Sequence, residues 1–100
     1  MPPFPQRLKE ARQRAGLSQE KLGMEAGLDP MSASARMNRY ELGKRVPSLG
    51  LVERIAAVLN VPMAYFYAVA DDEADMLRRF HLLSKRDRAR ALAFVDGLAG

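Results

Sequence analysis

The sequence predicts an all-α protein, and two observations lead to this conclusion. Apolar residues recur at intervals of three and four along most of the 100 residues, whereas no long stretch alternates with a period of two. Glycine, proline and capping residues also divide the chain into short segments of helical length. We therefore expect a five-helix bundle in residues 1–70, followed by a C-terminal helical hairpin in residues 71–100.

Proline, glycine and serine delimit the first two helices of the bundle. The first helix covers about residues 5–15, because proline suits an opening turn and Gly16 stops the helix. Ser18 caps the second helix, since its hydroxyl can accept from the free amides of the first turn. This second helix covers about residues 19–26, and Gly27 ends it.

A third helix is expected over about residues 29–42. Asp29 is an N-cap acceptor, and Pro30 has the fixed backbone angle that suits the first helical position. Gly43 stops this helix, and residues 44–47 form a basic loop. The third helix therefore ends directly before a cluster of positive charge.

Four further helices complete the chain. Ser48 caps a fourth helix over residues 49–59, and a short fifth helix occupies residues 61–67. The acids at positions 71–73 favour the start of a sixth helix, because the N-terminal end of a helix attracts negative charge. Ser84 caps a seventh helix, so the last two helices form the expected antiparallel hairpin.

The composition excludes several classes of protein. The sequence has no Cys and a single histidine, His81, which rules out disulfides, thiolate zinc sites and histidine metal clusters. It contains no nucleophile elbow and no glycine-rich phosphate loop, so we expect neither an enzyme nor a cofactor. The longest apolar stretch, residues 61–70, is too short to cross a bilayer. We therefore expect no membrane contact and a cytoplasmic location.

The net charge of +4 is concentrated in the first half of the chain. Residues 1–47 carry nine Lys and Arg against five Asp and Glu, whereas residues 48–70 and 71–100 are each balanced. A localised basic region beside neutral scaffolding is typical of a nucleic-acid binder.

Residues 17–45 fit a helix-turn-helix, in which the second helix of the pair enters the major groove of DNA. Gly23 lies in the middle of a helix, where glycine costs about 1 kcal/mol relative to alanine, so we expect another backbone to approach it closely. One face of the third helix forms a stripe that should be buried: Ala33, Met37 and Tyr40. The opposite face is small, polar and basic, which suits the reading of base edges.

Three segments of the sequence, GLSQEKLGMEAGL, RMNRYELGKRVPSL and IAAVLNVP, resemble the phage-repressor and Cro-like, or Xre-type, helix-turn-helix family. The resemblance extends over about residues 7–67. It implies a five-helix bundle that usually binds DNA as a dimer and reads it with the third helix.

The resemblance also implies roles for individual residues. Base-reading positions are occupied by Ser34, Ala35 and Asn38. With this motif around them, two neighbouring arginines are expected to contact bases as well: Arg36 and Arg39. Phosphate contacts are expected from four residues: Gln19, Lys21, Lys44 and Arg45. Gln19 has a second interpretation, in which it supports a base contact.

The chain departs from the family pattern in one place. Between Leu28 and Gly43 it has about four residues more than the usual repressor, around residues 29–32. This is about one helical turn, which either lengthens the start of the reading helix or loosens the turn before it. The resemblance further implies that Glu41 pairs with Arg12 on the first helix.

The C-terminal hairpin carries more apolar surface than two short helices can cover by packing on each other. We expect a homodimer, because a single reading helix covers few base pairs and two half-sites add specificity. The dimer contacts are expected from four residues: Phe80, Leu83, Phe94 and Leu98. In a competing interpretation this surface packs onto the fourth and fifth helices.

These observations predict a sequence-specific transcriptional regulator that binds double-stranded DNA, most simply a repressor that occupies an operator. One alternative is the antitoxin of a toxin–antitoxin pair, with residues 71–100 holding the toxin. Another is an adaptor that uses the same fold to bind proteins and does not read DNA.

Overall fold

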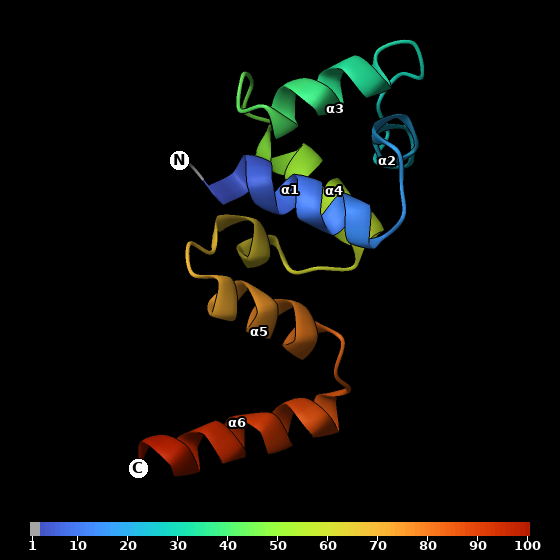
Figure 1. The fold of residues 1–100 in the computed structure, drawn as a ribbon. Helices are drawn as coiled ribbons and strands as arrows, with labels where there is room; N and C mark the ends of the chain where they lie inside the picture. Colours follow the sequence, from blue (N-terminus) through green and yellow to red (C-terminus); the bar gives the residue numbers. More distant parts are fainter. Residues whose placement is uncertain (1–2) are drawn as a thin grey trace.

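A computed structural model describes residues 3–100 of the chain, and these residues form helices without any strand (Figure 1). This arrangement confirms the predicted all-α class. None of the helices within residues 3–100 has both the length and the apolar composition needed to cross a membrane. The elements are α1 (Pro3–Arg14), α2 (Gln19–Glu25), α3 (Ala33–Glu41), α4 (Leu49–Leu59), the 3₁₀ helix η1 (Met63–Tyr67), α5 (Asp71–His81) and α6 (Lys85–Ala99).

One hydrophobic core holds the first five elements together. Each of them contributes at least one side chain with 2% or less of its surface exposed, and burial of such a side chain contributes about 1.5–3 kcal/mol. The largest of these side chains are Leu8, Leu22, Met37, Leu51, Val52, Ile55, Tyr65 and Phe66. The core fixes α3 on one side of the bundle, where one stripe of the helix is buried and the other is left free.

Three serines cap helices at the positions that the sequence indicated. Ser18 Oγ accepts from the backbone N–H of Lys21 over 3.0 Å, and Ser48 Oγ accepts from that of Leu51 over 3.2 Å. Ser84 Oγ accepts in the same way from the third residue of α6 over 3.1 Å. Each hydroxyl satisfies an amide that has no partner within its own helix.

The prediction that the third helix starts at Asp29 is wrong, because α3 starts at Ala33. Asp29 Oδ1 accepts from the N–H of Met31 over 2.8 Å, and the N–H of Ser32 donates to Asp29 O over 3.0 Å. Aspartate followed by proline also begins β-turns, and the observed bonds are those of a turn. The additional residues 29–32 therefore form the connection before the helix and do not lengthen it.

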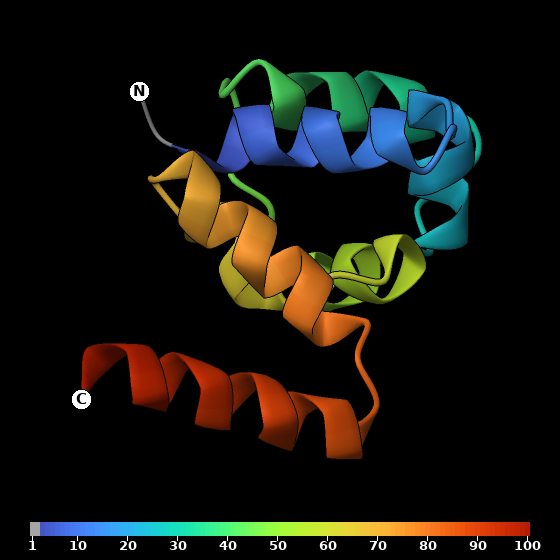
Figure 2. The ribbon, with the colours of Figure 1, turned by 60° about the horizontal axis from the view of Figure 1, so that its bottom comes forward.

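The two C-terminal helices are attached to the bundle to very different degrees. In two views, α3 and α6 lie at opposite ends of the molecule, with α5 between α6 and the rest of the bundle (Figures 1 and 2). Ala74 of α5 is buried in the core, whereas α6 has no buried residue. Only α5 is therefore part of the packed unit.

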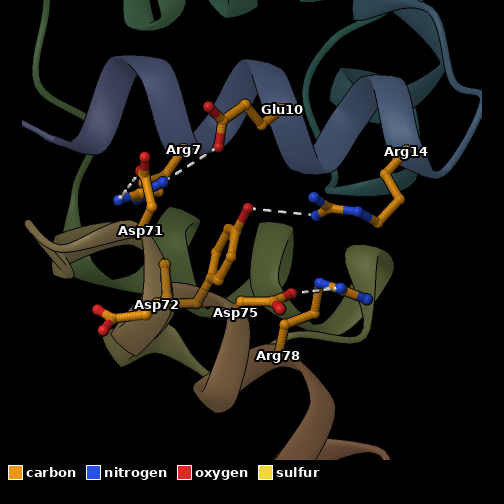
Figure 3. A pocket seen from close by; sticks show the side chains of 9 residues that line it. Arg7, Glu10, Arg14, Asp71, Asp72, Asp75 and Arg78 are labelled. Atoms are coloured by element: carbon orange, nitrogen blue, oxygen red, sulfur yellow. Dashed lines mark hydrogen bonds and ion pairs between the residues drawn. The ribbon is translucent and has the colours of Figure 1, made fainter.

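Arg7 of α1 anchors the start of α5. Its side chain is buried, and its guanidinium donates to the carbonyl oxygens of Ala68 and Val69 over 3.0 and 3.1 Å. It also forms ion pairs with Asp71 and Glu10 (Figure 3). Burial alone lowers the pKa of Arg7, but the bonds to these two carboxylates outweigh it and raise the pKa, so the guanidinium stays charged.

Candidate nucleic-acid interface

The interface begins with the close packing of α2 against α3. A Cβ atom added to Gly23 would lie 2.9 Å from Ala33 Cβ and 3.1 Å from Ala33 O. Real Cβ atoms essentially never approach a neighbour to 2.9 Å, so only glycine fits at this position. The unfavourable helix propensity of Gly23 is thus offset by the crossing of the two helices.

The two faces of α3 differ in exposure as the sequence pattern predicts. The three residues of the apolar stripe are buried: Ala33, Met37 and Tyr40. The five residues expected to read bases are all exposed: Ser34, Ala35, Arg36, Asn38 and Arg39. The helix therefore presents a small, polar and basic surface to the solvent.

A network of polar side chains connects α1 and α2 to this exposed surface. Arg12 donates from Nε to Glu41 Oε2 over 2.6 Å and from Nη2 to Glu41 Oε1 over 3.0 Å. Gln19 Nε2 donates to Glu41 Oε1 and to Asn38 Oδ1, each over 3.2 Å. The structure thus places Gln19 against Asn38, where it supports an exposed residue of α3.

The loop after α3 is fixed by the end of the helix. Gly43 has a positive φ of 73°, its N–H donates to Tyr40 O, and the N–H of Lys44 donates to Arg39 O over 2.9 Å. This pair of bonds closes the helix and leads the chain out of it with Lys44 and Arg45 exposed. Both side chains therefore lie on the surface just beyond the C-terminal end of α3.

The positive charges on this side of the molecule are not neutralised. Within residues 3–100, no carboxylate lies within 4.0 Å of the basic groups of Arg36, Arg39, Lys44 and Arg45. Lys21 differs from them, because its Nζ lies 3.6 Å from Glu25 Oε1. Unpaired cations on one surface create a potential that attracts an anionic partner.

A polar pocket of about 460 Å³ lies between α1, η1 and α5 (Figure 3). Most of its charged side chains are bonded to one another: Arg7 to Asp71 and Glu10, and Arg78 to Asp75. Bonds from Arg78 and Arg79 also lower the pKa of Asp75, so its carboxylate stays ionised. These pairs neutralise each other, and we assign the pocket a structural role.

The four residues expected to form dimer contacts have different surroundings. Phe80 is partly covered by its own chain, because the guanidinium carbon of Arg88 lies 5.2 Å from the centre of its ring. Leu83, Phe94 and Leu98 are 38%, 69% and 73% exposed. Of these four residues, the two on α6, Phe94 and Leu98, are therefore the most exposed.

Two contacts of the interface were not named by reasoning from the sequence. The resemblance left open whether Gln19 contacts a phosphate or supports a base contact, and its partner Asn38 depends on how α2 crosses α3. The second is a hydrogen bond from Arg36 Nη2 to Tyr40 Oη over 2.9 Å. The spacing of four residues between Arg36 and Tyr40 was a signal for the second feature, since such residues are neighbours on a helix.

Comparisons with known proteins agree with this geometry. The profile of the family described as "Helix-turn-helix domain" matches residues 4–65. The chain is also similar to the solved structure titled "Crystal structure of transcriptional regulator BswR", with 41% sequence identity and a TM-score of 0.88. That alignment covers 94% of this chain and 93% of the other, so the similarity includes α5 and α6. A comparison with curated proteins found no match.

Proposed function

We infer that this chain, which belongs to the helix-turn-helix domain family, is a DNA-binding transcriptional regulator. The observation that carries this conclusion is the exposed surface of α3 and the loop after it, where four basic side chains have no carboxylate partner among residues 3–100. DNA supplies both the dense negative charge and the groove that such a helix needs.

In our proposal, α3 lies in the major groove and reads base edges with four of its exposed side chains: Ser34, Ala35, Asn38 and Arg39. Lys44 and Arg45 contact phosphates beyond the end of the helix, and Lys21 contacts one from α2. Gln19 supports Asn38, because the two side chains are hydrogen-bonded in the free protein.

The salt dependence of binding tests the phosphate contacts. The logarithm of the affinity should fall linearly with the logarithm of the salt concentration, by about 0.9 for each phosphate neutralised. Lys44→Ala should make this slope shallower by about 0.9 without changing the preferred sequence. Lys85→Ala, an exposed lysine at the start of α6, is the matched control and should leave the slope unchanged. An unchanged slope in Lys44→Ala would remove Lys44 from the interface.

We further propose that the regulator is a repressor, which blocks polymerase by occupying an operator. Occupation of DNA requires no reaction, and no catalytic role is proposed. The test is transcription in vitro from a promoter that overlaps the selected binding site. Transcription that decreases as the protein is added supports repression, whereas an increase would identify an activator.

We propose that residues 1–70 bind DNA and that the helix α6 pairs two copies of the chain. Its apolar residues share one broad face and are at least half exposed: Leu92, Phe94, Val95 and Leu98. An apolar face of this kind on a 15-residue helix marks an interaction surface. Because α6 and α3 lie at opposite ends of the molecule, pairing through α6 leaves α3 free for DNA (Figures 1 and 2).

A charged substitution on α6 tests whether a second copy of this chain or another protein covers the apolar face of the helix. Phe94→Glu should convert a dimer into a monomer in analytical ultracentrifugation and weaken DNA binding. Val69→Glu, at a site 83% exposed outside α6, is the control and should remain dimeric. A wild-type chain that sediments as a monomer would contradict the homodimer and favour the antitoxin or adaptor function.

A further inference from the structure

A small hollow of about 150 Å³ lies at the C-terminal end of α3 and the loop that follows it. Four side chains line it: Arg36, Arg39, Tyr40 and Arg45. Three of the four are guanidinium groups, and within residues 3–100 none of these has a carboxylate within 4.0 Å. Three like charges around one space repel each other in the free protein, so an anion in the hollow would relieve this repulsion.

The fourth side chain, Tyr40, has a hydroxyl group whose hydrogen is not donated to any acceptor within residues 3–100. Arg36 Nη2 donates to Tyr40 Oη over 2.9 Å, and the guanidinium carbon of Arg36 lies 6.0 Å from the centre of the ring. The hydroxyl oxygen therefore accepts a bond, while its hydrogen has no acceptor among residues 3–100. Tyr40 is only 5% exposed and lines the hollow, so the acceptor for this hydrogen must come from solvent or from a ligand in the hollow.

The same bond determines the direction of Arg36. Its side chain runs along α3 toward the C-terminal end of the helix, where it reaches Tyr40, and it does not extend away from the helix axis. An arginine held in this way can donate to a phosphate from its remaining N–H groups, whose planar arrangement matches two phosphate oxygens.

We propose that Arg36, Tyr40 and Arg45 together bind one phosphodiester group of the DNA backbone, with Tyr40 donating its hydroxyl hydrogen to a phosphate oxygen. This inference rests on the proposed DNA-binding function and goes beyond it. It moves Arg36 from the base-reading set expected from the sequence to the phosphate contacts. It also gives Tyr40, a core residue, a direct contact with DNA that fixes the C-terminal end of α3 in the groove.

The first test removes the hydroxyl and keeps the ring. Tyr40→Phe should lower the affinity for every duplex about tenfold, because a hydrogen bond to a charged group is lost. The salt slope should not change, since tyrosine carries no charge. The matched control is Tyr65→Phe, which removes another nearly buried tyrosine hydroxyl, one that accepts from Arg14 on the other side of the bundle. This control should bind DNA as the wild type does.

The second test uses Arg36→Ala, which removes an exposed side chain and leaves the core intact. This variant should make the salt dependence of DNA affinity shallower by about 0.9. Selection of duplexes with it should yield the same consensus sequence as the wild type. Arg14→Ala should change neither quantity. A consensus that loses its preference at one base pair in Arg36→Ala would show that Arg36 reads a base, and would overturn the proposal.

The phosphate itself can be located with duplexes that carry one neutral methylphosphonate at successive positions. One position should weaken wild-type binding strongly, and this effect should disappear in Arg36→Ala, Arg45→Ala and Tyr40→Phe alike. Effects at two different positions for the two arginines would contradict a shared phosphate. If the wild-type chain binds no duplex, the proposed function fails; if it binds and Tyr40→Phe matches it, only this inference fails.

A titration with inorganic phosphate alone distinguishes the backbone of DNA from a free anion as the natural ligand. At constant ionic strength, inorganic phosphate should neither bind at millimolar concentration nor compete with the duplex, because one isolated site lacks the other contacts of the interface. Tight binding of free phosphate that is lost in Tyr40→Phe would identify a free anion as the ligand and overturn the assignment to DNA.

Discussion

Gln19 of α2 donates its side-chain amide to Asn38 Oδ1 of α3 over 3.2 Å. The same nitrogen donates to Glu41, whose carboxylate can only accept, so the amide orientation of Gln19 is determined by chemistry. Because Gln19 Nε2 can only donate, Asn38 must turn its oxygen toward it. The Nδ2 of Asn38 is left for another partner, and in the proposed interface it is the group that faces DNA. The side chains of α1 and α2 thus together determine how this exposed residue of α3 is oriented.

Asn38 should accordingly prefer a hydrogen-bond acceptor on the base that it contacts, which in the major groove means a purine N7, guanine O6 or thymine O4. Asn38→Ala should lose preference at one base pair per half-site, by about 1–3 kcal/mol. Gln19→Ala should weaken preference at the same base pair, since it frees the Asn38 amide to rotate. Measured affinities for a panel of single-base variants check both expectations. Effects of the two substitutions at different base pairs would contradict the positioning role of Gln19.

The ion pair between Arg12 and Glu41 should contribute strongly to stability. The side chains of Arg12 and Glu41 are only 13% and 3% exposed, so Arg12→Ala would leave a buried carboxylate without its cation. The expected loss is about 3–5 kcal/mol in the free energy of unfolding, measured by urea denaturation. Arg90→Ala is the control, because its pair with Asp87 is exposed and should contribute less than about 1 kcal/mol. Equal losses in the two variants would refute this difference.

Two glycines inside helices should respond in opposite ways to alanine. Gly23→Ala should destabilise the fold by about 1–3 kcal/mol, because the new methyl group overpacks against Ala33. Gly97→Ala in α6 should stabilise it by up to about 1 kcal/mol, since nothing lies within 4 Å and alanine favours the helix. Thermal unfolding of both variants measures the difference. A Gly23→Ala variant as stable as the wild type would mean that α2 and α3 are not tightly packed.

Local signals in the sequence were sufficient for most of the fold. A serine before a helical stretch has one favourable use, as an acceptor for the free amides of the first turn, and all three predicted caps are present. Asp29 followed by Pro30 was ambiguous, because the same pair begins a helix or a β-turn. The bonds that Asp29 makes are those of a turn, and the sequence alone could not choose between the two.

The site was predictable as a surface and not as a set of contacts. Helical periodicity separates the buried stripe of α3 from its exposed face, so the candidate reading residues could be named. The direction of Arg36 depends on the Tyr40 hydroxyl, and that of Asn38 depends on Gln19 in another helix. The apolar pattern of α6 similarly cannot say whether this face packs on the bundle, and in the structure none of it is buried.

Acid should remove the contribution of Asp75 to stability. Its pKa is lowered by bonds from Arg78 and Arg79, so the ionised carboxylate stabilises the folded state. A lowered pKa gives a contribution that is present above the ordinary value of about 4 and is lost as the pH falls through the folded-state value. Asp75→Asn should therefore be less stable than the wild type at pH 7 and equal to it at the acid end of a pH series of urea midpoints. A difference that persists unchanged in acid would contradict this account.

The central claim is that the exposed face of α3 reads DNA, and selection of bound sequences from random duplexes tests it most directly. Two proteins are compared, the wild type and Arg39→Ala, which removes an exposed side chain and should fold as the wild type does. The wild type should enrich a palindromic consensus with half-sites about one turn of DNA apart, about 34–36 Å. Arg39→Ala should retain the spacing and lose preference at one base pair in each half-site. No enrichment by the wild type, or an unchanged consensus in Arg39→Ala, would contradict the claim.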